Sequence, residues 1–174
     1  MKKLIFLISC IVFLSACGVE VLQDYGVDSV IFPENRQDVI NINGSIKQDS
    51  IVSSIAVHRS GVSPTYPEKT IGIIVNTDSV TAIINSANTA ITPSTEQLWF
   101  KGVMVLPASC FTVQSPIVIP ANSRTAPLSI TLIKSEIDKL DKTKVWLTAF
   151  SISPTNEINL IKNSNINFLK IVFK

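Results

Sequence analysis

The sequence predicts an all-β fold: a single Ig-like antiparallel β-sandwich with one or two short connector helices. Its 174 residues fit one domain. Hydrophobic residues make up 46% and charged residues only 16%, against roughly 25% charged residues in average soluble domains. That balance favours a packed core over disorder. Short β-branched runs separated by turn residues are typical of sandwiches.

Most of the chain after residue 28 divides into such runs. Several alternate strictly, with Ile71, Ile73 and Val75 on one side of a strand, which predicts one buried face. By the same alternation Trp146 and Phe150 point into the core. The predicted strands are Ser29–Phe32, Asp38–Ile42, Ser50–Arg59, Thr70–Asn76, Trp99–Leu106, Cys110–Val113, Ile117–Ile119, Ala126–Ile133, Lys144–Ser153 and Asn167–Phe173.

Two stretches depart from the β pattern. Asp78–Ala90 is rich in alanine and is predicted to hold a helical turn or two, with Asp78 as the N-cap. Ser135–Leu140 reads as one short helix that begins at Ser135. Both are expected as connectors on the sandwich, while Pro93–Gln97 is expected as a polar loop before a strand that opens at Trp99.

The N-terminus has the pattern of a signal peptide. Lys2 and Lys3 precede an apolar run that is too short to span a bilayer. Leu14-Ser15-Ala16-Cys17 follows and resembles the bacterial lipobox, in which cleavage precedes an acylated cysteine. The predicted organisation is therefore a signal peptide at 1–16, a tether at 17–28 and a domain at 29–174, with lipidation at Cys17. An ordinary secretory peptide cut near Ala16 is the alternative.

The charge and the cysteine content limit which binding partners are expected. Removing Lys2 and Lys3 from the 15 basic residues leaves 13, equal to the 13 acidic residues, which argues against nucleic acid. Outer-membrane lipid is the expected partner through Cys17, with the surface and periplasmic faces both open. Cys110 is expected to be a buried free thiol in an apolar strand.

The second half of the chain resembles a known family. Leu106-Pro107, Cys110–Val113, Ile117–Ser123, Leu140–Lys142 and Trp146–Ile152 follow one another as in the N-terminal β-sandwich domain of unknown function of Bacteroidetes lipoproteins. That domain also precedes family-18 endo-β-N-acetylglucosaminidase modules. The resemblance covers residues 29–173.

Four residues depart from that family's pattern. Cys110-Phe111 stands where the family has a tyrosine pair, Asn122 where it has glycine, and Ala149 where it has proline. The resemblance implies an accessory role in a glycan-utilisation system. Because the sequence ends at Lys174, we expect no appended catalytic module.

The sequence lacks the residues that several kinds of catalytic or metal-binding site require. His58 is the only histidine, and with Cys110 it cannot make a zinc site of the usual ligand type. The six glycines form no phosphate-binding loop. Asp138 and Asp141 lie between lysines and read as a solvated turn rather than as a glycosidase pair. We therefore expect no cofactor and no enzymatic activity.

Glycan binding needs only positioned aromatic faces and a few polar groups. The predicted site uses Trp99 and Tyr66 with Gln97, while Phe100 and Tyr25 are further candidates. The other interpretation is that Trp99 packs against the sandwich and Tyr66 covers a loop. A different class of function is also open: an adhesion or structural module that pairs with another envelope protein through a sheet edge.

Overall fold

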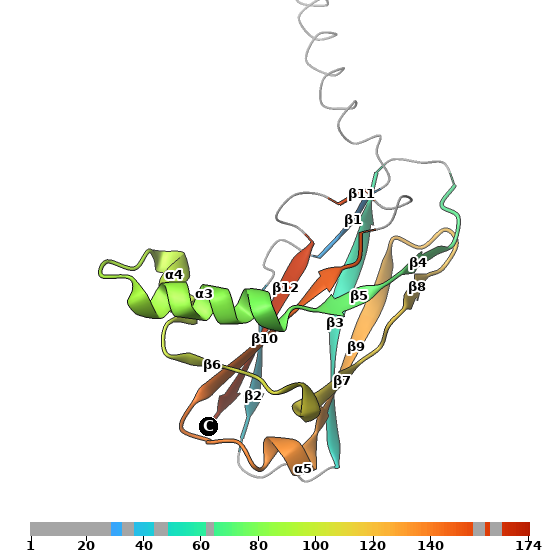
Figure 1. Ribbon diagram of the computed structural model, residues 1–174. Helices are drawn as coiled ribbons and strands as arrows, with labels where there is room; N and C mark the ends of the chain where they lie inside the picture. Colours follow the sequence, from blue (N-terminus) through green and yellow to red (C-terminus); the bar gives the residue numbers. More distant parts are fainter. Residues whose placement is uncertain (1–28, 33–36, 44–48, 62–64, 155–158, 161–164) are drawn as a thin grey trace, which may run out of the picture.

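The computed structural model describes residues 29–32, 37–43, 49–61, 65–154, 159–160 and 165–174. Two β-sheets pack face to face, and the two longest helices project at one side (Figure 1). This confirms the predicted sandwich with short helices. The signal peptide, Cys17, the tether and Tyr25 lie outside the described residues.

The first sheet has the strand order β11-β1-β3-β9-β7. Its longest pairing joins β3 to β9 in antiparallel register, from Ser50 opposite Ile133 to His58 opposite Thr125. The strands are β1 (Ser29–Ile31), β3 (Ser50–Ser60), β7 (Phe111–Val113), β9 (Thr125–Ile133) and β11 (Asn159–Leu160).

The second sheet has the order β2-β12-β10-β5, and β6 also pairs with β10. β5 lies antiparallel to the second half of β10, whereas β6 lies parallel to its first half. The two short strands therefore share one flank of β10. The strands are β2 (Gln37–Ile42), β5 (Ile73–Val75), β6 (Val103–Val105), β10 (Val145–Ile152) and β12 (Ile166–Phe173).

The sheets are mostly antiparallel but contain parallel pairs as well, such as β2 with β12. A small third sheet joins β4 (Lys69–Ile71) to β8 (Ile117–Ile119). The predicted strand Thr70–Asn76 is thus two strands that separate at Gly72. A Cβ at Gly72 would lie 3.0 Å from the Ser153 Cβ, so the absence of a side chain suits this crossing between sheets.

The space between the two sheets holds the inner core. Phe32, Phe150 and Leu169 are fully buried there, along with alternate residues of β9 such as Leu128 and Leu132. The alternation predicted for Ile71, Ile73 and Val75 is confirmed, since all three pack in this cluster.

Trp146 also faces the inner core, as its register with Phe150 predicts, but it is only half-buried. Its indole Nε1 donates a hydrogen bond to the Asp141 carbonyl oxygen at 3.1 Å. The indole therefore lies at the edge of the core, with its polar N–H directed to a turn.

A second apolar cluster, here called the outer cluster, lies on the other face of the second sheet. Helix α3 (Thr77–Thr89) contributes Val80, Ile84 and Ala87, and α4 (Thr95–Phe100) contributes Phe100. They cover alternate residues of β10, which is consequently buried on both faces. The expectation of a single buried face therefore fails for β10. The outer cluster comprises Val80, Ile84, Ala87, Phe100, Val103, Leu147 and Ala149.

Two local expectations for the helices are wrong. Asp78 lies in the first turn of α3, and Asn76 is the residue at the cap. The strand expected at Trp99–Leu106 begins only at Val103, because Trp99 belongs to α4. Ser94 caps that helix: its hydroxyl accepts from the Gln97 N–H, and the Gln97 side chain accepts from the Ser94 N–H.

α5 (Lys134–Ile137) falls where a short helix was predicted, and the 3₁₀ turn η1 (Ala108–Cys110) precedes β7. In the part of the chain that the structure describes, no helix is long and apolar enough to cross a membrane.

Asn122 explains one departure from the family pattern. Its φ is +59°, in the left-handed region that glycine adopts freely. Asparagine is among the residues that tolerate this region best. Here Asn122 also fixes the turn, because its N–H donates to the Tyr66 carbonyl oxygen at 2.8 Å. Asparagine can therefore stand where the resemblance implies a glycine.

Candidate functional site

A pocket lies between the two helices of the outer layer. α3 and α4 leave the edge of the second sheet between β5 and β6 and project beside the sandwich (Figure 1). The pocket has a volume of about 380 Å³, within the range of small-ligand sites. Its lining residues are Ala82, Ile83 and Ser86 from α3, Glu96, Gln97 and Phe100 from α4, and Phe168 from β12.

The pocket combines an apolar base with a polar rim. Phe100 is 3% exposed and belongs to the outer cluster, against which Ile83 and Phe168 pack. Ser86 and Glu96 are exposed, and Gln97 is half-buried. Glu96 is the one ionisable group among the lining residues. The pocket therefore offers apolar contact, hydroxyl and amide groups, and a single carboxylate.

Gln97 has one end fixed. Its Oε1 accepts the Ser94 backbone N–H at 2.9 Å, which completes the helix cap. The two N–H donors of a glutamine amide sit on its other atom, Nε2. The cap thus holds the side chain in place while leaving an amide donor group for a ligand.

Trp99 lies beside this pocket in a cluster of rings. Its centroid is 4.8 Å from that of Phe100 and 6.4 Å from that of Phe168, both in edge-on geometry. The Lys170 Nζ lies 3.6 Å from the indole centroid and donates to the Trp99 carbonyl oxygen at 2.5 Å. Burial lowers the pKa of the Lys170 ammonium.

This arrangement changes the role expected of Trp99. One face of its indole is covered by the Lys170 ammonium, a cation–π contact. The ring is half-buried and packs against the outer cluster. Trp99 therefore supports the pocket from the side, and a sugar could stack only on whatever part of the ring Lys170 leaves uncovered.

Tyr66 lies elsewhere and is 8% exposed. Its hydroxyl donates to the Gly61 carbonyl oxygen at 2.7 Å and accepts from Arg124 Nη2 at 2.7 Å. The Arg59 and Arg124 guanidinium carbons lie 4.8 and 5.2 Å from the ring centroid. The expected exposed stacking face is thus occupied by two guanidinium groups.

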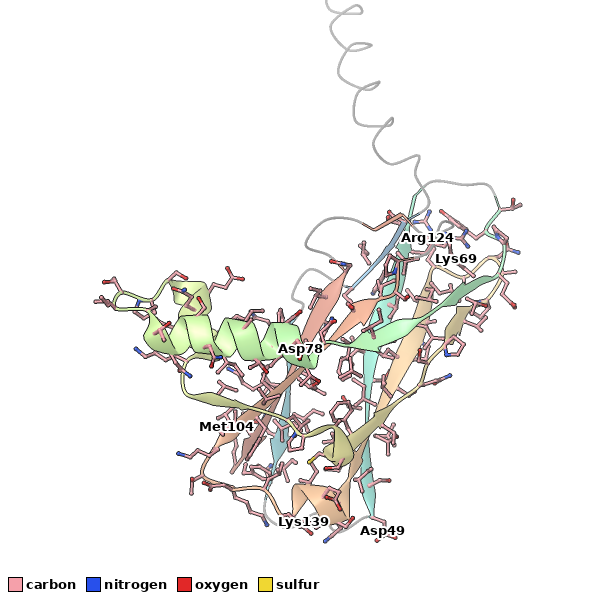
Figure 2. The ribbon with its side chains drawn as sticks, in the orientation of Figure 1. Asp49, Lys69, Asp78, Met104, Arg124 and Lys139 are labelled. Carbon is pink, nitrogen blue, oxygen red and sulfur yellow. The ribbon has the colours of Figure 1, made fainter. Side chains whose placement is uncertain are left out.

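The three predicted site residues are therefore only partly brought together. Gln97 lines the pocket and Trp99 adjoins it, both on α4. Tyr66 belongs to a cluster with Arg124, which Figure 2 shows at the end of the sandwich, away from the projecting helices. Sequence reasoning missed Ser86, Glu96 and Phe168, whose shared pocket depends on α4. A helix was predicted where α3 forms, but a loop and a strand were expected in place of α4.

The carboxyl groups of Asp138 and Asp141 are held by contacts within their own turn. Asp138 pairs with Lys134 at 2.5 Å, and this hydrogen bond holds the pKa of the Asp138 carboxyl below its usual range. Hydrogen bonds from Thr143 lower the pKa of Asp141. Both carboxyl groups are exposed, as expected for a solvated turn.

The Cys110 thiol is buried, and desolvation raises its pKa, which makes it a poor nucleophile. His58 is half-buried on β3. Among the residues that the structure describes, no cluster of three or more His, Cys, Asp or Glu side chains could hold a metal ion.

A two-sheet sandwich with a helical layer and a pocket of about 380 Å³ defines a class of domain rather than an activity. The family follows from the sequence match: residues 25–159 match the model of a family of N-terminal domains, and the chain belongs to that family. The resemblance to the N-terminal β-sandwich domain of Bacteroidetes proteins is thereby confirmed.

Solved structures from Bacteroides share the fold. A Bacteroides ovatus protein proposed to bind carbohydrate aligns with TM-score 0.58 and 12% identity over 83% of this chain and 36% of its own. A two-domain Bacteroides fragilis protein of unknown function aligns with TM-score 0.59 and 13% identity, covering 87% of this chain and 47% of its own.

A third structure, a Bacteroides ovatus protein of unknown function, aligns with TM-score 0.60 and 18% identity over 84% of this chain and 47% of its own. This chain thus spans about a third to a half of the length of these three relatives. At such identities the likeness concerns the fold alone. No curated protein matches the chain.

Proposed function

We propose that this protein is a non-catalytic glycan-binding or accessory component of a glycan-utilisation system, and that the pocket between α3 and α4 is its glycan site. The observation that carries the proposal is the pocket itself, with an apolar base at Phe100 and Phe168 and polar groups at its rim. Sugar rings present apolar C–H faces and many hydroxyl groups, which suit such a lining.

The fold supports the same proposal more weakly. One structural relative is proposed to bind carbohydrate, but it is a longer protein, and this chain covers 36% of it. The two carboxylates considered as a glycosidase pair lie in a solvated turn, where Asp138 is paired with Lys134 and Asp141 accepts from Thr143. Binding rather than turnover is therefore the activity proposed.

A glycan array followed by calorimetric titration tests the proposal. Ser86→Leu adds a bulky side chain to the pocket at an exposed helix position, and leucine is a good helix former. We expect this variant to lose binding of any glycan that the wild type binds. Asn85→Leu makes the same kind of change at the preceding position, which is also exposed but lies outside the lining, and this variant should bind normally.

If both leucine variants lose glycan binding to the same extent, or if both still bind normally, the glycan binds elsewhere. Failure of the wild type to bind any glycan on a broad array would contradict the proposed function itself.

We also propose that the protein is anchored in the outer membrane through an acylated Cys17. The support is the order of Lys2-Lys3, an apolar run and Leu14-Ser15-Ala16-Cys17. Cys17→Ala should leave the membrane fraction or stay unprocessed when expressed in a Bacteroides host. Unchanged association that still needs detergent for release would contradict the anchor.

Strand pairing with another envelope protein is the second candidate. Within the described residues, β2 pairs only with β12, so it forms an edge of the second sheet. Val39 on this strand is 48% exposed. Asp38 lies on the same face of β2 as Ile40, the face toward the inner core. Its carboxylate accepts a hydrogen bond from Asn167 Nδ2 at 3.0 Å. An inward-directed charge protects an edge against pairing, so this candidate ranks second.

A further inference from the structure

The lining of the pocket is selective for one kind of substituent. Ala82, Ile83, Phe100 and Phe168 provide an apolar surface, which would leave the hydroxyl groups of a plain hexose unpaired wherever they met it. An ionised Glu96 carboxylate can accept hydrogen bonds but cannot donate them, whereas the Ser86 hydroxyl and the Gln97 amide can donate. A ligand that complements this lining needs a donor, an acceptor and a small apolar group close together.

The charge of the pocket excludes one class of sugar. Among the seven lining residues Glu96 alone is ionisable, and it is acidic. Lys170, on the same strand as the lining residue Phe168, is engaged with the ring and carbonyl oxygen of Trp99. Uronic and sialic acids would therefore place a carboxylate beside Glu96 without a counter-charge from the lining, which is unfavourable.

We infer that the pocket between α3 and α4 recognises the acetamido group of an N-acetylated amino sugar. This inference rests on the proposed function and specifies its ligand. The acetamido N–H is a donor for the Glu96 carboxylate, and the acetamido oxygen is an acceptor for the Gln97 amide or the Ser86 hydroxyl. Its methyl group packs against the apolar base that Ile83, Phe100 and Phe168 form.

The helix pair suits this task because part of its lining is held in place. Gln97 is fixed by its cap bond to Ser94, and Glu96 precedes it in the first turn of the same helix. Phe100 and Phe168 are locked by edge-on contact at 5.1 Å. A prearranged lining loses less conformational entropy when the ligand binds.

Three trisaccharides with the same β-1,4 linkage test the inference on the purified full chain by calorimetric titration. They carry an acetamido group, an amino group or a hydroxyl group at C2: the N-acetylglucosamine trimer, its deacetylated form and cellotriose. We expect the acetylated trimer to bind at least about tenfold more tightly than cellotriose, since one buried methyl group in an apolar pocket gives a factor of that size. Saturation-transfer NMR should show its acetamido methyl protons closest to the protein.

Equal or tighter binding of cellotriose would overturn the inference and leave the proposed glycan function standing. Tighter binding of the deacetylated trimer would also overturn it, by showing that Glu96 attracts an ammonium group instead. If no glycan on the array binds, the proposed function fails together with the inference.

A conservative variant tests the part assigned to Glu96. Glu96→Gln keeps the shape of the side chain but replaces the charged acceptor, so the acetylated trimer should bind several-fold more weakly. Glu68→Gln neutralises an exposed carboxylate that does not line the pocket and should leave the titration unchanged. Unaltered binding by Glu96→Gln would overturn the assignment of the acetamido N–H to Glu96.

Discussion

The inner core and the outer cluster bury opposite faces of the same strand, β10, by different means. In the inner core a second sheet covers Phe150 and Ile152. In the outer cluster two helices cover Leu147 and Ala149. The inner core closes a sandwich that many proteins share, while the outer cluster carries the pocket. The comparison teaches that the sheets provide the scaffold and the helical excursion provides the candidate site.

The two regions also differ in how the chain reaches them. Neighbouring strands with long hydrogen-bonded pairings, such as β3 with β9, build the inner core. The outer cluster depends on a chain segment that leaves the sheet after β5 and returns in β6. An excursion of this kind can change its length and side chains without disturbing the strand pairing, which suits a variable binding site.

The largest expected effect is on the inner core. Phe150→Ala removes a fully buried ring that contacts Phe111 edge-on at 5.8 Å. Large aromatic truncations of this kind cost roughly 3–5 kcal/mol of unfolding free energy. Denaturant unfolding should show that loss with a single transition. A cost below about 1 kcal/mol would mean that the two sheets do not depend on this contact.

Ile84→Ala tests the outer cluster in the same way. Ile84 is 6% exposed and faces β10 from α3, so its truncation should cost about 2–4 kcal/mol. Hydrogen exchange should accelerate in α3 and α4 more than in β3 and β9, because the helices depend on this cluster. Uniform acceleration over the whole domain would show that the two regions unfold as one unit.

The sandwich could be predicted because its evidence is local and repeated. Alternation at Ile71, Ile73 and Val75 indicates a buried face regardless of what covers it. The helical layer left weaker signals. Leu147 and Ala149 are apolar residues on the outward face of a strand already buried inwardly, which indicates a second covering layer.

Another signal lies within Pro93–Gln97, the segment predicted as a polar loop. Ser94-Thr95-Glu96-Gln97 fits the capping-box pattern, and α4 begins at that point. Recognising it would have placed Trp99 on a helix. The pocket itself could not be predicted, because Phe168 reaches it from a strand distant in sequence.

Trp99→Ala has an intermediate expected effect. Because Trp99 is half-buried, contacts Phe100 and Phe168, and has the Lys170 ammonium over its ring, its loss should cost about 1–3 kcal/mol. The free energy of unfolding measured in denaturant checks this. An unchanged value would restore Trp99 as a free stacking platform for sugar, the role first expected of it.

Tyr66→Phe has the smallest expected effect and concerns the scaffold alone. It deletes the hydroxyl that bonds to Gly61 and Arg124 but keeps the ring in contact with the Arg59 and Arg124 guanidinium groups. A loss of about 1 kcal/mol is expected, with glycan binding unchanged. Weakened binding at unchanged stability would move the site from the helical layer to this end of the sandwich.

Amide chemical-shift mapping tests the central claim most directly. The isotope-labelled protein would be titrated with the tightest-binding glycan from the array while every assigned amide is followed. The account predicts that the largest shifts fall on α3 and α4, at Ala82, Ser86 and Gln97, with little change around Tyr66 and Arg124. Shifts confined to the Tyr66–Arg124 end, or spread along the edge strand β2, would contradict a glycan site in the helical layer.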